Sequence, residues 1–191
     1  MTAKSTHINA ALFSVASIIA ATAPLTASAD GFYVGADVFE LYTDVGIIFG
    51  TSHSTQHLRV KGGYAWMDYL AIEAQVMTAD EDTDTYTFFT STDYNFNTGT
   101  IIGIYAKPKT NFKKANVYGL IGFSTWQTEY TNLTDATKSS DSVLMYGIGV
   151  GGEFNITNNL KFNIEAIFHD GNASYSDITS SGFAAGLSYH F

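Results

Sequence analysis

Six charged residues occur at alternate positions within segments whose other alternate positions are mostly apolar. They are Asp37, Arg59, Lys61, Glu73, Glu153 and Glu165. Successive side chains of a β-strand point to opposite faces, so this spacing places the charges on one face and the apolar residues on the other. Carboxylates beside Arg and Lys can form ion pairs, which an enclosed face would require because an unpaired buried charge costs several kcal/mol. The sequence predicts an internal charge network, in which Asp37, Lys61 and Glu73 are the expected first contacts because they come from consecutive segments.

The densest run of charge lies elsewhere, in a polar segment. It comprises Asp80, Glu81, Asp82 and Asp84, and the aromatic residues Phe88 and Phe89 follow it. An EF-hand would have Gly after the third acidic position and Glu at the twelfth, where this chain has Thr85 and Ser91. The run therefore favours a solvated loop over a calcium loop, although divalent-cation bridging stays open. The aromatics indicate either a contact surface or strands that continue as a paired sheet. No pattern in the chain predicts a catalytic residue, a metal centre or a cofactor.

Eight strand-like segments position these residues, and each is near the roughly 9–11 residues that a tilted strand needs to cross a bilayer. Polar and apolar residues alternate plainly in the second, third, sixth, seventh and last of these segments. The facing of the fourth and fifth segments is ambiguous, because adjacent apolar residues, Ile101 with Ile102 and Leu120 with Ile121, occupy both faces. The segments are 31–41, 57–67, 70–79, 97–107, 115–127, 142–155, 160–169 and 182–191.

The connections between the segments alternate in length. Short ones follow segments two, four and six, whereas 42–56, 80–96, 128–141 and 170–181 are longer and rich in Thr, Ser, Asp and Asn. Long loops on one side and short turns on the other are typical of transmembrane barrels. The sequence predicts an all-β, eight-stranded antiparallel up-and-down transmembrane barrel, whose narrow lumen side chains fill. A soluble barrel is the alternative.

Four lysines near the second short turn, Lys107, Lys109, Lys113 and Lys114, predict a solvated turn.

The amino terminus and the composition set the compartment. Residues 1–29 have a weakly basic start, an apolar stretch and the small residues Ala27, Ser28 and Ala29, which predict a secretory signal peptide. Residues 30–191 then form a single domain. The chain has no Cys and a net charge of −9, so we expect neither disulfides nor a nucleic-acid partner.

A resemblance to a known family covers the whole of residues 30–191. The row Phe32 to Asp37, the Gly-rich Tyr146 to Gly152, the strand 162–168 with inward Glu165, and the closing Gly186 to Phe191 are similar to the outer-membrane barrel superfamily of OmpA and OmpX. The resemblance implies a Gram-negative outer-membrane barrel, and the alternation of long and short connections then predicts that both termini lie in the periplasm. The resemblance also implies that Leu187, Tyr189 and Phe191 form the signal recognised by the outer-membrane assembly machinery.

An enzyme is the less favoured function. Barrels that resemble lipid A deacylases have a His, a Ser two residues later, then Asn and Ala. Here Gly171 stands at the Ser position between His169 and Asn172, and glycine has no hydroxyl for a nucleophile. We therefore expect His169 to be an ordinary surface residue and the protein not to be an enzyme.

The expected function is structural or surface-interacting. The resemblance implies envelope integrity or an adhesion-like role, carried by long external loops that include Asp80 to Asp84, Phe88 and Phe89. Expected partners are membrane lipid, lipopolysaccharide, the assembly machinery, and host or neighbouring-cell surface molecules. A narrow ion channel is the alternative.

Overall fold

The computed structural model describes residues 31–45, 52–79, 84–87, 93–110, 112, 114–132, 137–173 and 176–191. These residues form nine strands and contain no apolar helix long enough to cross a membrane. The strands are β1 (Phe32–Val45), β2 (Ser52–Met67), β3 (Leu70–Ala79), β4 (Asp84–Thr87), β5 (Asp93–Pro108), β6 (Ala115–Asn132), β7 (Thr137–Asn155), β8 (Leu160–Ala173) and β9 (Ser176–His190). The predicted signal peptide, 1–29, lies outside the described residues.

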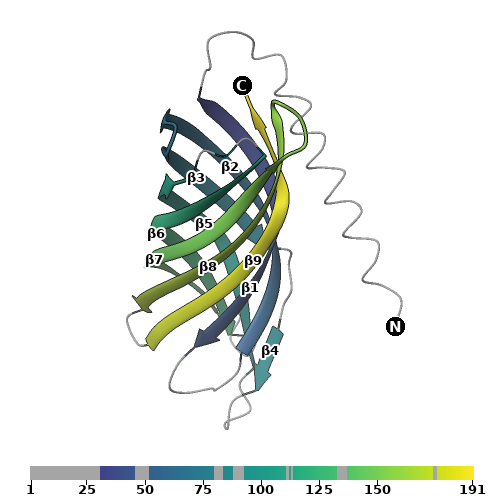
Figure 1. Cartoon of the computed structure of the whole chain (residues 1–191). Coiled ribbons are helices and arrows are strands. Elements are labelled where there is room, and N and C mark those ends of the chain that lie inside the picture. The colour runs from purple at the N-terminus through teal and green to yellow at the C-terminus, as the bar shows by residue number, and fades with distance from the viewer. Residues whose placement is uncertain are drawn as a thin grey trace, which may run out of the picture.

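Eight of these strands close into an antiparallel barrel. Each long strand pairs with its neighbour in the sequence, β1 also pairs with β9, and a β3–β5 pairing completes the ring (Figure 1). The short strand β4 pairs with β5 beyond the last β3–β5 contact. The predicted architecture of eight strands in up-and-down order is confirmed, and β4 is an addition to it.

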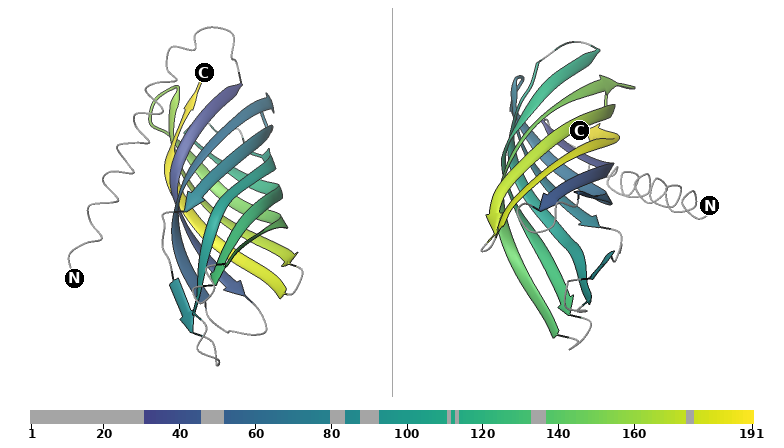
Figure 2. Two further views of the ribbon diagram at one scale, coloured as in Figure 1. Left: turned by 180° about the vertical axis from the view of Figure 1, so that it is seen from behind. Right: turned by 90° about the horizontal axis from the view of Figure 1, so that it is seen from below.

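The two ends of the barrel differ. Short connections join β2 to β3, β5 to β6 and β7 to β8 at the end where β1 begins and Phe191 lies, which we call the turn end (Figures 1 and 2). At the turn end the Phe191 amide donates a hydrogen bond to the Phe32 carbonyl. The opposite end, where β4 lies, is the loop end.

The strands extend further toward the loop end than the sequence predicts. Thr128 pairs with Asp141 and Asn132 with Thr137, so most of the expected loop 128–141 is a β6–β7 hairpin. Likewise Asp170 pairs with Thr179 and Ala173 with Ser176. The expectation of four long loops is therefore wrong for these two connections, because polar Thr, Ser and Asp segments can satisfy their backbone groups by continuing the ladder into water.

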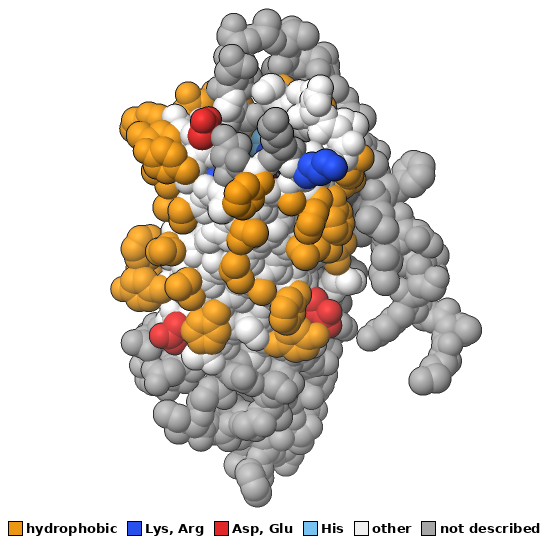
Figure 3. Space-filling model, in the orientation of Figure 1, with side chains coloured by type: hydrophobic (Ala, Val, Ile, Leu, Met, Phe, Trp, Pro, Cys, Tyr) orange, Lys and Arg blue, Asp and Glu red, His pale blue; other side chains and the backbone are white. Residues whose placement is uncertain are grey.

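The wall of the barrel has the alternation that the sequence predicts, and the structure settles the two ambiguous segments. In β5, Ile102 and Ile104 point outward while Ile101, Tyr105 and Lys107 are buried inside. In β6, the outward residues include Ile121 and Phe123, and the buried ones are Asn116, Tyr118, Leu120, Ser124 and Trp126. Exposed apolar side chains lie on the outside of the barrel between its ends, and Figure 3 shows those on one face.

Candidate functional site

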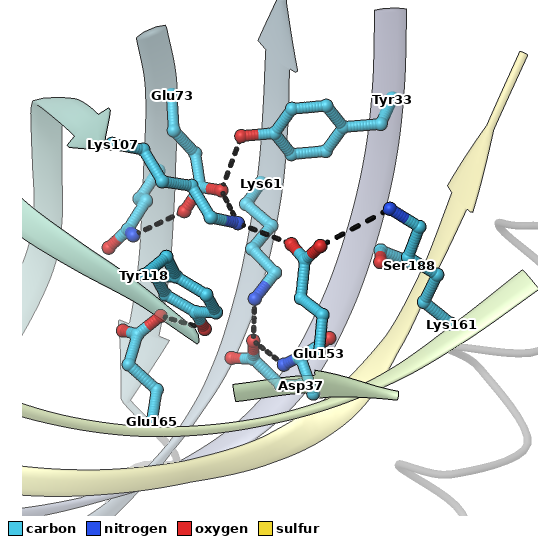
Figure 4. Close-up of polar contacts among 12 residues, drawn as sticks. Tyr33, Asp37, Lys61, Glu73, Lys107, Tyr118, Glu153, Lys161, Glu165 and Ser188 are labelled. Atoms are coloured by element: carbon cyan, nitrogen blue, oxygen red, sulfur yellow. Dashed lines mark hydrogen bonds and ion pairs between the residues drawn. The ribbon is translucent and has the colours of Figure 1, made fainter. Parts of the chain in front are cut away.

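The candidate site is a network of charged side chains inside the lumen, nearer to the turn end. All six residues that the sequence predicts for it are buried there: Asp37, Arg59, Lys61, Glu73, Glu153 and Glu165. Alternation within each strand turns them inward, and the neighbouring strands bring them together. Figure 4 shows five of them, Asp37, Lys61, Glu73, Glu153 and Glu165, entering the lumen from different strands.

Arg59 of β2 forms the centre of the network. Its Nε and Nη2 donate to the two carboxylate oxygens of Asp37, at 2.6 and 2.9 Å, and its Nη1 donates to Glu165 on the far side of the lumen. Lys61 Nζ lies 2.8 Å from Asp37 Oδ2. Two cations therefore share Asp37, and the planar guanidinium supplies the fork geometry that fits a carboxylate.

A second group of ion pairs surrounds Lys107 of β5. Lys107 Nζ lies 3.0 Å from Glu73 Oε2 and 2.7 Å from Glu153 Oε1, and Lys161 Nζ lies 3.3 Å from the other Glu153 oxygen. The lysine also lies 4.0 Å from the centre of the Tyr118 ring. The predicted solvated turn is wrong for Lys107, because β5 continues to Pro108 and its alternation turns this side chain inward.

The first contacts expected from the sequence are only partly present. Lys61 does pair with Asp37, but the ion-pair partner of Glu73 is Lys107. Glu73 also accepts hydrogen bonds from Tyr33 and from Gln75, each at 2.7 Å. Tyr118 OH donates to Glu165 Oε2 at 2.9 Å. These contacts satisfy most of the carboxylate oxygens, as buried anions require.

The network is electrically balanced and is packed by aromatic rings. Four cations, the fourth being Lys161, face four carboxylates. Tyr33 lies over Gly63 and Tyr118 over Gly151, where an added Cβ would lie 2.3 Å from a ring carbon. The small residues on the inward face thus make room for two rings that bind the carboxylates.

Above the network, toward the loop end, the lumen becomes apolar. Its buried side chains there are Phe39, Leu41, Met77, Ile101, Leu120, Trp126, Val143, Met145, Ile167 and Ile178. We call this group the apolar layer. It follows the charge network along the same inward faces, so the lumen holds charged side chains in one part and hydrocarbon in the next.

Two histidines are buried within the apolar layer. His57 Nε2 lies 2.9 Å from Thr55 Oγ1, and His169 Nε2 lies 2.9 Å from Tyr105 OH. The expectation that His169 is a surface residue is wrong, because it occupies an inward position of β8 and is fully buried. Its contact is a tyrosine of another strand, and Gly171 on the same strand supplies no nucleophile.

The remaining predicted residues lie at the two ends of the barrel. Leu187, Tyr189 and Phe191 share the outward face at the turn end, and the rings of Tyr189 and Phe191 meet at 5.2 Å. Asp80, Glu81, Asp82, Phe88 and Phe89 fall outside the described residues, and Asp84 is described only as part of the β4 backbone. The network members that sequence reasoning missed include Lys107, Lys161, Tyr33, Tyr118 and Gln75. Alternation counted back from Pro108 could have found Lys107.

Comparison with solved structures supports the architecture. Neisserial surface protein A superposes with a TM-score of 0.67 at 17% identity, covering 85% of this chain and 98% of that one. Ail of Yersinia pestis superposes with a TM-score of 0.58 at 16% sequence identity, covering 85% of this chain and 99% of that one. OprG of Pseudomonas aeruginosa superposes with a TM-score of 0.57 at 10% sequence identity, covering 85% of this chain and 96% of that one. At these identities the likeness shows the fold alone.

Sequence comparison gives the family. No curated protein matches the chain. The family profile described as "Outer membrane protein beta-barrel domain" matches residues 10–191, which is most of the sequence. With an apolar outer wall, a closed ring of strands and this match, the chain is an outer-membrane protein and belongs to the outer membrane protein beta-barrel domain family.

Proposed function

We propose that this protein is a closed outer-membrane barrel with a structural and surface-contacting role, rather than an enzyme or an open channel. The observation that carries the proposal is the filled lumen. The charge network neutralises itself with ion-pair contacts of 2.5–3.3 Å, and the apolar layer follows it along the same inward faces. An eight-stranded barrel has room for side chains but not for an open bore. Both termini are then periplasmic and the loop end is external.

The experiment that tests closure is electrical. In planar bilayers at pH 7, the refolded protein is expected to give no step-like single-channel current. Lys61→Met is also expected to stay closed, because the apolar layer remains. Regular current steps from the unaltered protein, changed in amplitude by Lys61→Met, would support the channel instead.

The charge at the loop end indicates what kind of surface it can contact. Of the 18 acidic residues, four lie in the charge network and Asp30 and Asp68 lie near the turn end in sequence. Eight of the other twelve belong to the loop-end parts of β1 and of β4 to β9. The remaining four fall between these strands in sequence, and Lys138 is the one Lys or Arg in the same stretches. A field of this sign repels polyanions and attracts cations.

This charge favours cation-bridged contact with lipopolysaccharide over direct binding of a polyanion. The Ail structure is a complex with the heparin analogue sucrose octasulfate. We expect the present barrel not to bind that polyanion, but to bind lipopolysaccharide-containing vesicles more strongly with millimolar Mg²⁺ than with a chelator. Calorimetry with both probes is the measurement. Strong binding of sucrose octasulfate, or vesicle binding indifferent to Mg²⁺, would contradict the proposal.

The carboxyl terminus is proposed to direct assembly. Leu187, Tyr189 and Phe191 are outward-facing, and Phe191 adds one backbone hydrogen bond, to Phe32. Deletion of Phe191 is therefore expected to lower the outer-membrane level several-fold in cells while changing the stability of the refolded protein by only about 0.5–1.5 kcal/mol. Fractionation and urea unfolding measure the two effects. Normal outer-membrane levels of the deletion variant would exclude the assembly role.

A further inference from the structure

Two titratable side chains lie in the apolar layer, where the proposed function makes no use of them. His57 is 1% exposed and His169 is 0% exposed. The ring of Phe39 lies 6.4 Å from that of His57, and the ring of Trp126 lies 5.5 Å from that of His169. Both imidazoles are therefore enclosed by hydrocarbon and aromatic side chains at the level that closes the lumen.

Each imidazole has one satisfied nitrogen and one unsatisfied nitrogen. The Nε2 atoms contact Thr55 and Tyr105, whereas both Nδ1 atoms are buried without a hydrogen-bond partner, as is Ser180 Oγ on the strand beside His169. A neutral imidazole has one donor and one acceptor nitrogen, but the protonated ring must donate from both. Protonation thus creates a donor that has no acceptor in the described surroundings.

The surroundings also lack a free counter-charge. On the inward faces, the charged group nearest to His57 along β2 is Arg59, and the one nearest to His169 along β8 is Glu165, four residues away. Asp170 follows His169 directly in sequence, but its side chain is exposed on the outward face. Glu165 is already bound by Arg59 and Tyr118, and Asp37 by Arg59 and Lys61. Among the described side chains, neither imidazole contacts a carboxylate. The groups that contact or pair with the two residues from other strands are neutral: Phe39 (β1), Tyr105 (β5), Trp126 (β6) and Ser180 (β9). The other residues of the apolar layer are uncharged as well.

We propose that the apolar layer is an acid-sensitive plug, which opens the lumen to ions when His57 and His169 take up protons. The proposal rests on the closed lumen argued above. An imidazolium buried in hydrocarbon, beside the positive charge of Arg59 and without an anion, is strongly unfavourable, and hydration relieves it. Water that enters beside His57 and His169 replaces the hydrocarbon contacts that close this level.

Conductance at two pH values tests the proposal. At pH 7 the barrel is expected to be closed. At pH 4 the mean current through it is expected to rise roughly tenfold or more, because the free-energy cost of an unpaired buried charge exceeds the cost of the packing contacts that are lost when water enters. Acid also protonates carboxylates of the charge network, so variants must identify the responsible groups. The double variant His57→Gln, His169→Gln keeps an amide near each Nε2 position and is expected to stay closed at pH 4.

His190→Gln is the matched control. His190 lies at the turn end, stacked on Tyr33 with 4.9 Å between ring centres, outside the apolar layer. This variant is expected to open in acid like the unaltered protein, and a heat-modifiability gel at each pH verifies that every variant is folded. No current at pH 4, or equal acid currents from the double variant, would overturn the proposal. Current already present at pH 7 would instead contradict the closed barrel itself.

Tryptophan fluorescence provides a second readout that does not need the Gln variants to fold. The chain has two Trp residues, and Trp66 is on the outer wall. In Trp66→Phe, Trp126 reports on the protonation of His169, since an imidazolium quenches a nearby indole. Fluorescence is expected to fall over the same pH range in which current appears. Quenching without current, or current without quenching, would show that His169 does not control the plug.

Discussion

Replacing Arg59 by methionine is expected to lower the free energy of unfolding by about 3–5 kcal/mol, the cost of leaving buried ionic partners uncompensated. Arg59 donates to both oxygens of Asp37 and to Glu165, and it is completely buried. Methionine fills much of the same volume but leaves Glu165 with Tyr118 alone and Asp37 chiefly with Lys61. Urea unfolding of the barrel in lipid vesicles, followed by tryptophan fluorescence, measures the effect.

Lys114→Met is the matched control for this experiment. Lys114 is exposed in the β5–β6 connection, so loss of its charge is expected to change stability by less than about 1 kcal/mol. A triple variant, Arg59→Met with Asp37→Asn and Glu165→Gln, is expected to recover part of the loss, because it removes the stranded charges. If Arg59→Met were no more damaging than Lys114→Met, the charge network would have no structural role.

Placing arginine at Ile148 is expected to destabilise the inserted barrel by about 2–4 kcal/mol, the cost of a cation on the lipid face near the bilayer midplane. Ile148 lies near the middle of β7, between Ile121 and Phe168, and its side chain is 60% exposed on the outer wall. On a soluble protein a side chain this exposed would face water, so the same substitution would hardly change the free energy of unfolding. Folding titrations in vesicles, read by heat-modifiability, measure the cost.

The control is Asn158→Arg, in the exposed β7–β8 turn, where the arginine side chain reaches water and the expected change is close to zero. The loss of stability caused by Ile148→Arg should also be smaller in short-chain lipid or in detergent, because the guanidinium can then reach water. Equal stability of the two variants in vesicles would show that the apolar wall does not face lipid.

Alternation made the facing of most strands predictable. Arg59 and Lys61 were placed inside and Val60 and Tyr64 outside from their spacing, because a period of two is a property of each strand by itself. The ambiguous segments show where this local rule is not enough. In β5 and β6 the alternation is intact, but apolar side chains occupy both faces: Ile101 and Leu120 belong to the apolar layer, whereas Ile102 and Ile121 are on the outer wall.

The contacts within the site were less predictable than its members. Glu73 pairs with Lys107 rather than Lys61, because the tilt and stagger of closed strands decide which inward residues share a level. Lys107 itself was missed because three of its sequence neighbours are also lysines near a turn. His169 was misassigned for a similar reason, since its position beside a predicted loop becomes an interior one once β8 continues to Ala173.

The sequence by itself determined the class of the molecule: an outer-membrane barrel of eight strands with charged residues on the inner face. These properties follow from side-chain alternation and from connection lengths, which are local. The tertiary structure alone decided that Lys107 completes a neutral network, that an apolar layer lies above it, and that His57 and His169 sit within that layer. Those features arise from residues brought to one level by different strands, and only closure of the ring fixes which residues meet.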